Sequence, residues 1–525
     1  MFLKLNYIIV ILLWLCLVNF ILSARILFVG IAPSLSHHIF FRHLIKELAF
    51  RGHHVVSITP DPINDPELIN ITEIDTHNET YGVILTQKWL ESVQYQKLSE
   101  MNLMRLYLPL FHEKDDKVLS APKVQELIHN PNEHFDVVIV EWLMVSAHYF
   151  GFRERFNCPS IGVASLDTTI NVMDAIGNSP DPNYYGSFFT EFSGGNLNFW
   201  ERLQLLWHHI DFRYYYYFQY LPGCNKLLAK HFNVTNKSAW DLEKSVDLLL
   251  TNTNPIFHIP RPKVPTYIDI GGMHLADRKP LPKDLKKFLD DSKQGVIYFS
   301  LGSNVQSTNL PDDTRTAILD VFRQLPFTVL WKWESDSLPD KPKNVITKSW
   351  FPQQDVLDHP NLKAFIMQGG IQSIEEAIRS AVPLICVPFG TDQKFNARRI
   401  ADLEIGRQLS FDDITVDTLK DAITDITTNP KYKKNIQKLS EVLWDQPTKP
   451  LDRAVWWIEY VIRHGGAKHL RSPAADLPWY KYLLLDILGF IFGVAIIGLI
   501  VIVKAIKLFL KFGLYITKKI KYKVE

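Results

Sequence analysis

Two glycine-containing turns in this chain are suited to holding phosphate groups. Gly369-Gly370 follows the apolar run F-I-M-Q and opens a helical pattern. Backbone N–H groups and the dipole at a helix N-terminus attract anions, and glycine allows the backbone to come close to them. Gly302-Ser303, after the run G-V-I-Y-F-S, offers a second approach of the same kind. Either turn alone is equally consistent with an ordinary strand-to-helix connection.

The longer segment around the first turn, from Trp350 to Asn396, has the layout of a nucleotide site. It alternates apolar, strand-like runs with turn residues, and its polar residues fall at the ends of loops, where a nucleotide could be gripped. The charge of the chain is nearly balanced, with 57 Lys and Arg against 56 Asp and Glu. This balance argues against nucleic acid as the substrate.

Apolar runs that alternate with helical patterns must position these turns. Arg25–Gly30 predicts a buried strand, His37–Arg51 a helix, and Val55–Ile58 the next strand. Gly295–Ser300 begins a second series in the same way. Continuous apolar strands between helices indicate parallel sheets that are covered on both faces. We therefore expect an α/β protein with two facing doubly wound, Rossmann-like domains and a ligand cleft at the carboxyl ends of the strands.

A chain of 525 residues is too long for a single core. The boundary between the two domains is expected from Pro260 to Pro282, where several prolines and Gly271-Gly272 interrupt regular structure. Further along, Asp452–Arg463 predicts an amphipathic helix that could cross back over the first domain.

The two ends of the chain predict a membrane protein. Lys4, the apolar run Ile8–Leu22 and then Ser23-Ala24 have the layout of a signal peptide cleaved near Ala24, with an uncleaved anchor as the alternative. Leu483–Val503 is apolar and long enough to cross the ~30 Å hydrocarbon core, although a buried core helix would look similar. The lysines that follow mark the tail as cytosolic; the tail could lie on the membrane surface as an amphipathic helix or stay solvated.

The body of the chain fits the secretory route. Four N-x-Ser/Thr sequons, which are usable only on that route, begin at Asn70, Asn78, Asn233 and Asn236. Beyond the expected signal peptide the cysteines are Cys158, Cys224 and Cys386, so we expect no disulfide framework and a large apolar core instead.

The segment after Trp350 also carries a resemblance to a known family. W-F-P-Q-Q-D-V-L-D-H-P, then F-I-M-Q-G-G-I-Q-S-I-E-E-A-I and V-P-L-I-C-V-P-F-G-T-D-Q-K-F-N resemble the donor-binding signature of the membrane-bound UDP-glycosyltransferases, most of all their arthropod members. The resemblance implies a GT-B type fold and a UDP-sugar donor. The expected segments are 1–24 signal peptide, 25–260 N-terminal acceptor-binding domain, 261–284 linker, 285–450 C-terminal UDP-sugar-binding domain, 451–482 return helix and juxtamembrane segment, 483–503 transmembrane helix and 504–525 basic cytosolic tail.

The resemblance implies roles for individual residues. In the family, the Trp of the W-x-P-Q element stacks on uracil, its Gln contacts the nucleoside, the Glu after Gly-Gly binds the ribose hydroxyls, and the Asp-Gln pair reads the transferred sugar. Carboxylates and amides suit hydroxyls because they form bidentate hydrogen bonds. Taken singly, Trp350 could be a core aromatic and Glu376 part of a solvated helix face. The implied donor-binding residues are Ser303, Trp350, Gln353, Gln368, Gly369, Gly370, Ser373, Glu376, Asp392 and Gln393.

The sequence departs from many relatives at Gln368, where they have a His that contacts phosphate. A neutral amide can still donate a hydrogen bond, so we expect donor binding with less charge stabilisation. Arthropod relatives commonly have Gln at this position.

The same family suggests a catalytic base, which a hydroxyl acceptor needs. Ser36-His37-His38 followed by Arg51-Gly52-His53 resembles its N-terminal element, in which a His in a loop-to-helix turn is the base, and the spacing selects His37. The helix dipole disfavours an imidazolium there. Taken alone, His37 could equally be a capping or surface residue, and His38 is expected to face solvent or to pack locally.

Relatives pair this His with an acidic residue at the end of a later strand. After the run Phe135–Val140 that position is Glu141, which can hold the imidazole tautomer, and Asp136 is the competitor. The implied reaction is direct displacement with inversion: His37 deprotonates the acceptor and UDP leaves. The chain has no Asp-x-Asp motif, so we expect neither a metal nor a cofactor.

The acceptor is less defined. Tyr184-Tyr185 and Tyr214–Phe218 offer aromatic surface for a lipophilic molecule, or else belong to the core or face a membrane. Glucose is the expected sugar, because arthropod relatives usually use UDP-glucose and no decisive basic residue for a uronate is evident. A non-catalytic membrane-anchored binding protein for lipophilic ligands and a lipid or sterol glycosyltransferase of the same family are the alternatives.

These expectations describe a single-pass type I protein of the endoplasmic reticulum membrane, with a lumenal catalytic part and a cytosolic tail. Lys521 and Lys523 resemble a di-lysine retrieval signal. The expected partners are a UDP-sugar donor, a small lipophilic acceptor and membrane lipid, with no nucleic acid. Self-association into a homo-oligomer is left open.

Overall fold

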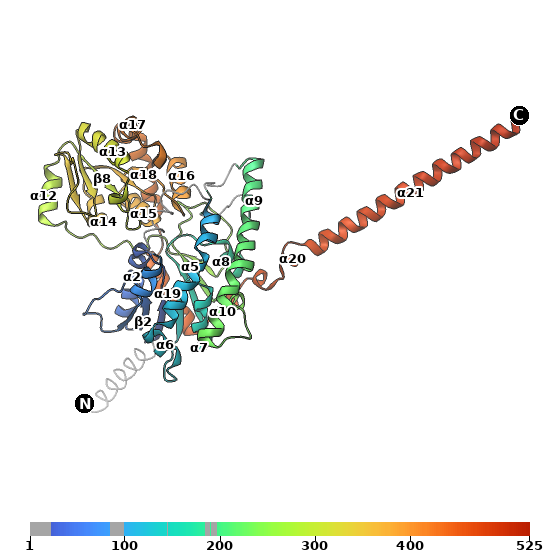
Figure 1. Cartoon of the computed structure of the whole chain (residues 1–525), viewed down its shortest axis with the longest axis horizontal. Helices are drawn as coiled ribbons and strands as arrows, with labels where there is room; N and C mark the ends of the chain where they lie inside the picture. Colours follow the sequence, from blue (N-terminus) through green and yellow to red (C-terminus); the bar gives the residue numbers. More distant parts are fainter. Residues whose placement is uncertain (1–22, 85–98, 144, 184–188, 191–196, 525) are drawn as a thin grey trace, which may run out of the picture. The chain divides into compact units, whose positions relative to one another are not determined.

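Two parallel β-sheets form the framework of the protein (Figure 1). The computed structural model describes residues 23–84, 99–143, 145–183, 189–190 and 197–524. The chain divides into two units, Met1–Arg471 and Ser472–Glu525. The expected signal peptide lies almost wholly outside the described residues.

The first sheet contains seven parallel strands among the described residues, in the order β3-β2-β1-β4-β5-β6-β7. In this register Val29 pairs with both Ile58 and Val140, so the strands end at a common edge. The last strand falls inside the segment expected to be a linker. The strands are β1 (Arg25–Val29), β2 (His54–Thr59), β3 (Ile71–Asp75), β4 (Val137–Glu141), β5 (Ser160–Ala164), β6 (Leu248–Thr251) and β7 (Tyr267–Asp269).

Helices connect these strands. The described helices of this part are α2 (Leu35–Phe50), α3 (His77–Ile84), α5 (Glu100–Ser120), α6 (Pro122–His129), η1 (Ala147–Phe150), α7 (Gly151–Phe156), α8 (Ile170–Ala175), α9 (Phe199–Tyr214), η2 (Tyr215–Tyr220), α10 (Leu221–Phe232) and α11 (Ala239–Lys244).

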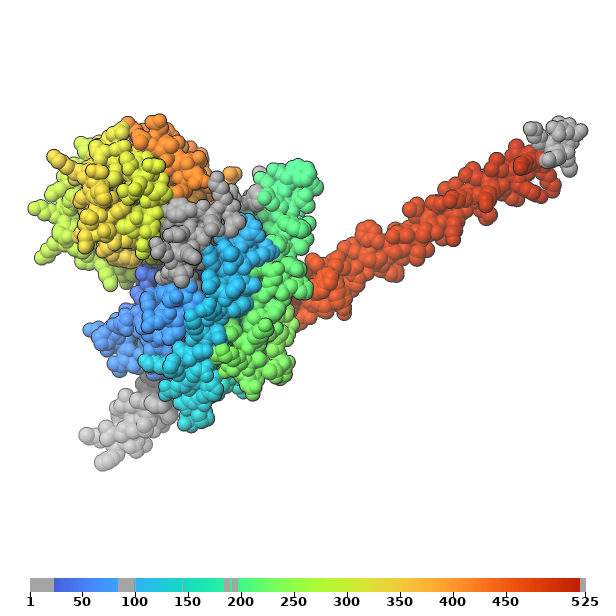
Figure 2. All heavy atoms as spheres, in the orientation of Figure 1, coloured from blue at the N-terminus to red at the C-terminus, as the bar shows by residue number. Residues whose placement is uncertain are grey.

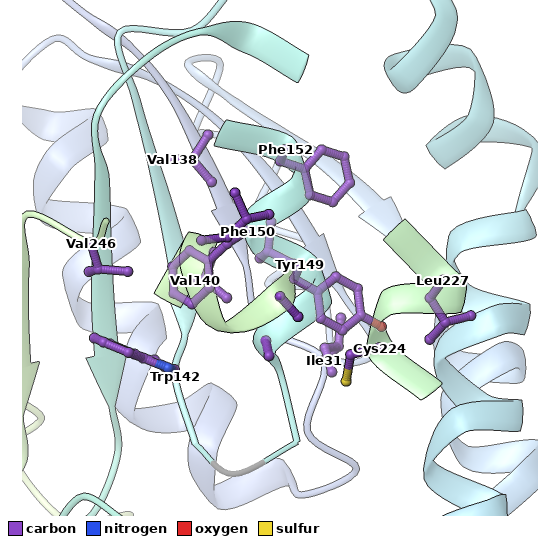
Figure 3. Packing of buried hydrophobic residues seen from close by; sticks show 14 of the residues in the cluster. Ile31, Val138, Val140, Trp142, Tyr149, Phe150, Phe152, Cys224, Leu227 and Val246 are labelled. Atoms are coloured by element: carbon purple, nitrogen blue, oxygen red, sulfur yellow. The ribbon is translucent and has the colours of Figure 1, made fainter. Parts of the chain in front are cut away.

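Both faces of the first sheet are buried, as its continuous apolar strands predict. Val138 and Val140 of β4 pack on one face against Phe150 and other residues of the following helices (Figure 3). Val137 and Ile139 point to the opposite face, because side chains alternate along a strand. Cys158 and Cys224 are free and buried on this sheet, and Cys386 is free and buried in the core of the second sheet.

The second sheet has six parallel strands among the described residues, in the order β10-β9-β8-β11-β12-β13. The strands are β8 (Val296–Ser300), β9 (Thr328–Lys332), β10 (Val345–Lys348), β11 (Leu362–Met367), β12 (Leu384–Cys386) and β13 (Gly406–Gln408). Its described helices are α12 (Lys283–Asp291), η3 (Ser307–Asn309), α13 (Asp312–Gln324), α14 (Gln353–Leu357), α15 (Ile371–Arg379), α16 (Gln393–Asp402), η4 (Phe411–Asp413), α17 (Val416–Thr428) and α18 (Pro430–Trp444).

The helix α19 (Pro450–His464) follows the second sheet in sequence but packs on the first. Its residues Val455 and Ile458 are buried together with Phe41 of α2. Arg51, which directly follows α2, reaches Asp452 of α19 with an N–O distance of 2.8 Å. In Figure 2 the parts of this unit that carry the two sheets adjoin each other, blue to green for the first and yellow to orange for the second. The short helix η5 (Lys468–Leu470) ends the unit.

The second unit is mostly one helix. It contains η6 (Pro473–Asp476), α20 (Trp479–Tyr482) and α21 (Leu485–Val524). Within the described residues, Leu485–Lys519 is long and apolar enough to cross a membrane. The helix starts two residues later than the predicted span and continues without a break past Val503, because the lysines of the predicted tail are themselves good helix formers.

Candidate active site

His37 and Glu141 meet at the carboxyl ends of two neighbouring strands. Because β1 and β4 pair in parallel, the loop after β1 and the last residue of β4 lie at the same edge of the sheet. Nδ1 of His37 is 2.5 Å from Oε1 of Glu141, and Oε2 of this carboxylate accepts a hydrogen bond from the Ala32 N–H at 3.1 Å. The Glu141 side chain is 3% exposed and that of His37 is 15% exposed. A nearly buried acid therefore holds an imidazole whose other edge remains reachable.

The local sequence places His37 in the first turn of a helix. The helix α2 begins at Leu35, two residues before the predicted start, with Ser34 at the N-cap. The His37 N–H donates to the Ser34 carbonyl oxygen at 3.0 Å. The positive end of the helix dipole therefore acts on this imidazole.

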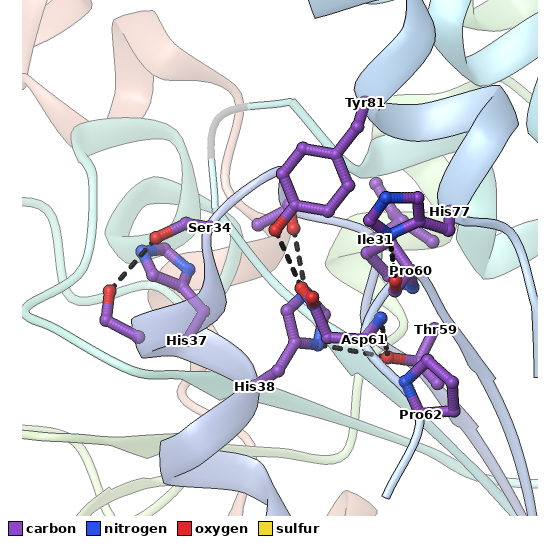
Figure 4. Close-up of polar contacts among 12 residues, drawn as sticks. Ile31, Ser34, His37, His38, Thr59, Pro60, Asp61, Pro62, His77 and Tyr81 are labelled. Carbon is purple, nitrogen blue, oxygen red and sulfur yellow. Dashed lines mark hydrogen bonds and ion pairs between the residues drawn. The ribbon is translucent and has the colours of Figure 1, made fainter. Parts of the chain in front are cut away.

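His38 packs locally and does not enter the cavity described below. Its Nε2 is 2.8 Å from the Ala32 carbonyl oxygen and its Nδ1 is 3.1 Å from Oγ1 of Thr59. Figure 4 shows this ring pointing toward Thr59 and Asp61, while His37 lies apart from them. Burial lowers the pKa of His38, which favours its neutral form.

The competing acid, Asp136, lies at the other end of these strands. Its Oδ2 accepts a hydrogen bond from the Arg25 N–H at 2.7 Å, before β1 and β4 run toward His37. Glu141 is different. Burial opposes its ionisation, but the facing His37, and to a lesser degree His38 and the Ala32 N–H, lower the pKa of this carboxyl overall. Glu141 is therefore an anion able to accept a hydrogen bond from the Nδ1–H of His37.

Both glycine turns identified in the sequence require glycine. Gly369, after β11, has φ +98°, and a Cβ there would lie 2.7 Å from Sγ of Cys386. Gly302, after β8, has φ +79°, and a Cβ there would lie 2.3 Å from Nε2 of Gln368. The two strands are neighbours in the sheet, so both turns lie at one edge. Gly370 is the N-cap of α15 and makes no side-chain capping bond, which leaves the first N–H groups of this helix available to a ligand.

A hydrogen-bonded network surrounds Glu376 on α15. Gln353 donates to Oε2 of Glu376 at 2.6 Å and also reaches Oγ of Ser373 at 2.9 Å. Gln354 donates to Oε1 of Glu376 at 3.2 Å, and Tyr298 donates to Oε1 of Gln353 at 3.2 Å. Glu376 is thus a mostly buried carboxylate with a fixed orientation, and it is not on a solvated helix face.

Trp350 is an exposed aromatic at the rim of the same site. Its side chain is 54% exposed, which excludes the alternative that it is a core residue. Nζ of Lys332 lies 5.7 Å from the centre of the indole ring and donates to the Gly302 carbonyl oxygen at 2.8 Å. A flat apolar face is therefore available next to the glycine turn after β8.

Asp392 and Gln393 are fixed at the start of α16. Oδ2 of Asp392 accepts from Nδ2 of Asn396 at 2.8 Å, and burial raises the pKa of Asp392. Oε1 of Gln393 accepts from the Phe389 N–H at 2.8 Å, and its Nε2 donates to Oε1 of Gln368 at 3.3 Å. The amide at Gln368 is therefore already oriented by a neighbour.

A cavity of about 540 Å³ joins these groups. Its wall includes His37 from the first part of the chain and, from the second, Ser303, Trp350, Gln353, Gln368, Gly370, Ser373, Glu376, Asp392 and Gln393. Glu141 and Gly369 stand behind this wall. The two parts also touch directly, because Gln372 of α15 donates to the Ser36 carbonyl oxygen at 2.9 Å and Asn304 donates to Oγ of Ser34 at 2.9 Å. The sequence analysis did not identify these last contacts, although Gln372 lies directly after Gly-Gly.

The aromatic run Tyr214–Phe218, expected to offer acceptor surface, lies away from this cavity among the described residues. Tyr215 and Tyr216 are buried in the core of the first part, whereas Tyr214 and Phe218 are exposed. Tyr184-Tyr185 lies outside the described residues. The apolar part of the cavity wall is formed instead by Ile39, Met104, Phe111, Leu143, Val145, Leu166 and Phe189.

The predicted sequons differ in accessibility. Asn78, Asn233 and Asn236 are exposed, whereas Asn70 is half-buried and its amide donates to the Ala49 carbonyl oxygen at 3.5 Å. The first three can be reached by a transferase in the folded state.

Two facing parallel-sheet domains with a cleft between them define the class of GT-B glycosyltransferases. The solved structure of CalG4, the calicheamicin glycosyltransferase, has a TM-score of 0.54, is 17% identical, and is matched over 84% of this chain and 98% of that chain. The glycotransferase of kitacinnamycin gives a TM-score of 0.53 at 18% identity, over 83% and 98% of the two chains. At such identities the likeness shows the fold alone.

The family is shown by sequence. The family model for "UDP-glucoronosyl and UDP-glucosyl transferase" matches residues 25–520, and the chain belongs to this family. It is 32% identical to UDP-glycosyltransferase UGT5 of Dactylopius coccus, over 92% of each chain. It is 31% identical to the ecdysteroid UDP-glucosyltransferase of Lymantria dispar multicapsid nuclear polyhedrosis virus (91% and 94% covered) and 29% identical to UDP-glucuronosyltransferase 1A3 of Rattus norvegicus (90% and 89%).

The chain is therefore an enzyme that transfers a sugar from a UDP-sugar to an acceptor. The predicted family and the predicted fold, two doubly wound α/β domains, are confirmed. The apolar helix α21 fits a membrane anchor.

Proposed function

We propose that this enzyme transfers glucose from UDP-glucose to a hydroxyl of a small lipophilic acceptor, with inversion and without a metal ion, and that His37 is the general base. One observation carries the proposal. The His37 ring, held by Glu141 at 2.5 Å, lies on the wall of the cavity that also contains the N-terminus of α15. A proton acceptor and an anion-binding helix end thus share one space.

The base acts through its Nε2 atom. Because the Nδ1–H of His37 donates a hydrogen bond to Glu141, Nε2 carries the lone pair that can take a proton from the acceptor hydroxyl. Glu141 then balances the positive charge that develops on the ring. The apolar wall, which includes Met104, Phe111 and Leu166, favours a lipophilic acceptor beside this imidazole.

The donor is held from the other side of the cavity. Trp350 offers a face for the uracil, Glu376 and Gln353 offer oxygens and an amide for the ribose and base, and Asp392 with Gln393 faces the sugar. Free N–H groups at the start of α15 and the Gly302 turn stabilise the charge that builds up on the leaving diphosphate. With no Asp-x-Asp motif in the chain, these backbone groups take the place that a divalent metal has elsewhere.

Glucose is favoured by the charges around the cavity. Among the described lining residues, the lysines are Lys279 and Lys332, and both lie on the nucleotide side, beside Asp355 and Trp350 respectively. A uronate would call for a cation near Asp392 instead. Relatives from Dactylopius coccus and from a nuclear polyhedrosis virus of Lymantria dispar are named UDP-glucosyltransferases, which supports the same sugar.

A His37→Ala variant tests the base. Microsomes that express the full chain would be given UDP-glucose or UDP-glucuronate and a panel of phenols, alcohols and sterols, with products identified by mass. We expect the variant to lose about 10²- to 10⁴-fold in transfer, the usual contribution of a general base, while its affinity for UDP stays near that of the wild type. His129→Ala, on an exposed side chain 92 residues further along, is a matched control that should retain activity.

Three results would each contradict part of the proposal. Full transfer by His37→Ala would exclude His37 as the base. Binding of UDP without transfer to any acceptor by the wild type would favour the non-catalytic binding protein. A preference for UDP-glucuronate would refute the assigned sugar and leave the base unaffected.

We also propose that α21 anchors the enzyme in the endoplasmic reticulum membrane as a type I protein with a lumenal catalytic part. The support is the apolar stretch Leu485–Lys519, followed by lysines toward the end of the chain. Resistance to carbonate extraction and protection of the catalytic part from protease in sealed microsomes would test this topology. Digestion of the catalytic part in sealed vesicles would contradict it.

A further inference from the structure

A buried histidine outside the cavity stands between two carboxylates of the donor side. His274 lies in the segment between β7 and α12 and is 0% exposed. Its Nδ1 is 3.6 Å from Oε2 of Glu375, and its Nε2 is 3.5 Å from Oε1 of Glu376. Both carboxylates are on α15, and the Glu375 side chain is 2% exposed. Neither the family resemblance nor the mechanism above uses this imidazole.

Of His274, Glu375 and Glu376, only Glu376 is among the described residues that line the cavity. One of its oxygens, Oε2, accepts from Gln353 at 2.6 Å, and the other, Oε1, faces both Gln354 at 3.2 Å and His274. The imidazole therefore approaches the carboxylate from behind, on the side away from a bound nucleotide.

The charges explain why a histidine stands here. Two adjacent buried carboxylates repel each other and lack the water that would solvate them, so a cation between them is strongly favoured. Burial lowers the pKa of His274, but Glu376 and Glu375 outweigh it and raise this pKa overall. Burial raises the pKa of Glu375 to about 7. The positive charge that compensates the Glu376 carboxylate is therefore carried by the His274 imidazole.

His274 also connects the donor side to the first part of the chain. Its ring lies 5.9 Å from that of Phe40 on α2, the helix that carries His37. Gln354, which bonds Glu376, also donates to the His274 carbonyl oxygen at 3.4 Å. His274 is thus held through its backbone carbonyl and through the packing of its ring, and the buried ring can support the carboxylate.

We propose that His274 is a positioning residue: it fixes the Glu376 carboxylate so that its oxygens accept hydrogen bonds from the ribose hydroxyls of the nucleotide. This inference rests on the proposed ribose-binding role of Glu376. Loss of the imidazole would let the carboxylate turn toward the vacated space or hold it less firmly. The nucleotide would then lose its ribose contacts and keep those to uracil and diphosphate.

The experiment compares two ligands that differ by one hydroxyl. Purified full-length protein in nanodiscs would be titrated with UDP and with 2′-deoxy-UDP by calorimetry. A hydrogen bond to a charged group predicts that the wild type binds UDP about tenfold or more tightly than 2′-deoxy-UDP. We expect His274→Leu to reduce this ratio to about twofold or less, with little effect on 2′-deoxy-UDP. His274→Gln, whose amide can still donate to Glu376, should recover part of the ratio.

A matched control and a second variant distinguish the loss of the His274 side chain from misfolding. His43→Leu changes a neighbouring histidine on α2 that bonds the Ile39 carbonyl oxygen, and it should keep the wild-type ratio. Should His274→Leu fail to fold, His274→Leu combined with Glu375→Gln removes one carboxylate together with the imidazole and gives the same comparison.

The outcomes separate this inference from the proposed function. If the ratio of UDP affinity to 2′-deoxy-UDP affinity is unchanged in the His274 variants but is lost in Glu376→Gln, only the positioning role of His274 is overturned. A ratio unchanged in Glu376→Gln overturns the ribose role of Glu376, and the inference with it. Equal weakening of both ligands in His274→Leu would show a merely structural effect and would also overturn the inference.

Discussion

Replacement of Glu141 by Gln removes the negative charge that faces the proposed base, His37. The side chain is 3% exposed and accepts from His37 on one oxygen and from the Ala32 N–H on the other. A glutamine has the same shape but only one oxygen. If its NH₂ faces Ala32, two donors oppose each other; if it faces His37, Nδ1 must accept and Nε2 must carry the proton. Each orientation loses a hydrogen bond, and the second leaves His37 unable to act as a base.

The size of the effect follows from the contact. A hydrogen bond between charged groups contributes about 1.5–3 kcal/mol, which corresponds to roughly 10- to 150-fold in rate. His37 and Glu141 become such a pair when the ring takes the proton of the acceptor. We therefore expect Glu141→Gln to lower kcat/KM for transfer by about this factor, and to change the affinity for UDP by less than about twofold, because the donor side is separate.

The assay measures transfer to one acceptor and UDP binding on the same preparations. Glu141→Asp keeps the charge on a chain one methylene shorter and should retain more activity than Glu141→Gln. The lowered pKa of Glu141 means that its ionised form stabilises the folded protein above the ordinary carboxyl pKa, and that this stabilisation is lost as the pH falls through the lowered folded-state value. Equal activity of Glu141→Gln and the wild type would refute the acid–imidazole pair.

Three further predictions concern other parts of the structure. Gly369→Ala should lower the free energy of unfolding by about 1–3 kcal/mol and weaken UDP binding, because φ is +98° and a Cβ would meet Cys386. Gly370→Ala is the control: a Cβ there has no neighbour nearer than 3.8 Å, so thermal melts should show little change. Burial raises the pKa of Glu243 from its ordinary 4.5 to about 7, so stability should fall by up to about 3 kcal/mol as the pH rises between these values; Glu243→Gln should flatten this slope in melts at pH 5 and 7.5, and an unchanged slope would contradict it. The exposed sequons begin at Asn78, Asn233 and Asn236, and the half-buried one begins at Asn70. Changing the Asn of an exposed sequon to Gln should reduce the change in electrophoretic mobility that glycosidase treatment causes. If only the change at Asn70 reduced it, the structure would be contradicted.

Local patterns were sufficient to predict much of the fold. The apolar run Arg25–Gly30 becomes β1, and Gly295–Ser300 becomes β8 with one residue fewer at its start. Such strands are recognisable because burial on both faces demands continuous apolar sequence. The helix α2 starts two residues earlier than predicted, with the His37 N–H bonded to the Ser34 carbonyl oxygen, because a first helical turn can form without an apolar repeat to mark it.

Other features depend on contacts between distant segments. The strand β7 lies in a proline-rich stretch that looks like a linker, and it is a strand only because β6 pairs with it. The aromatic run Tyr214–Phe218 and the apolar cavity wall have similar composition, but Tyr215 and Tyr216 fill the core, Tyr214 and Phe218 are exposed, and none of the run lines the cavity. Hydrophobicity predicts that a side chain will be buried, but it does not predict which surface will cover it.

The family, the two-sheet architecture and the glycine turns at Gly302 and Gly369 could be predicted from local sequence, because glycine and apolar periodicity act over a few residues. The contacts of Glu141 with His37 and of His274 with Glu376 could be found only in the folded protein. These pairs are separated by about a hundred residues. They meet because parallel strands bring their ends to one edge and because α15 packs against the segment after β7.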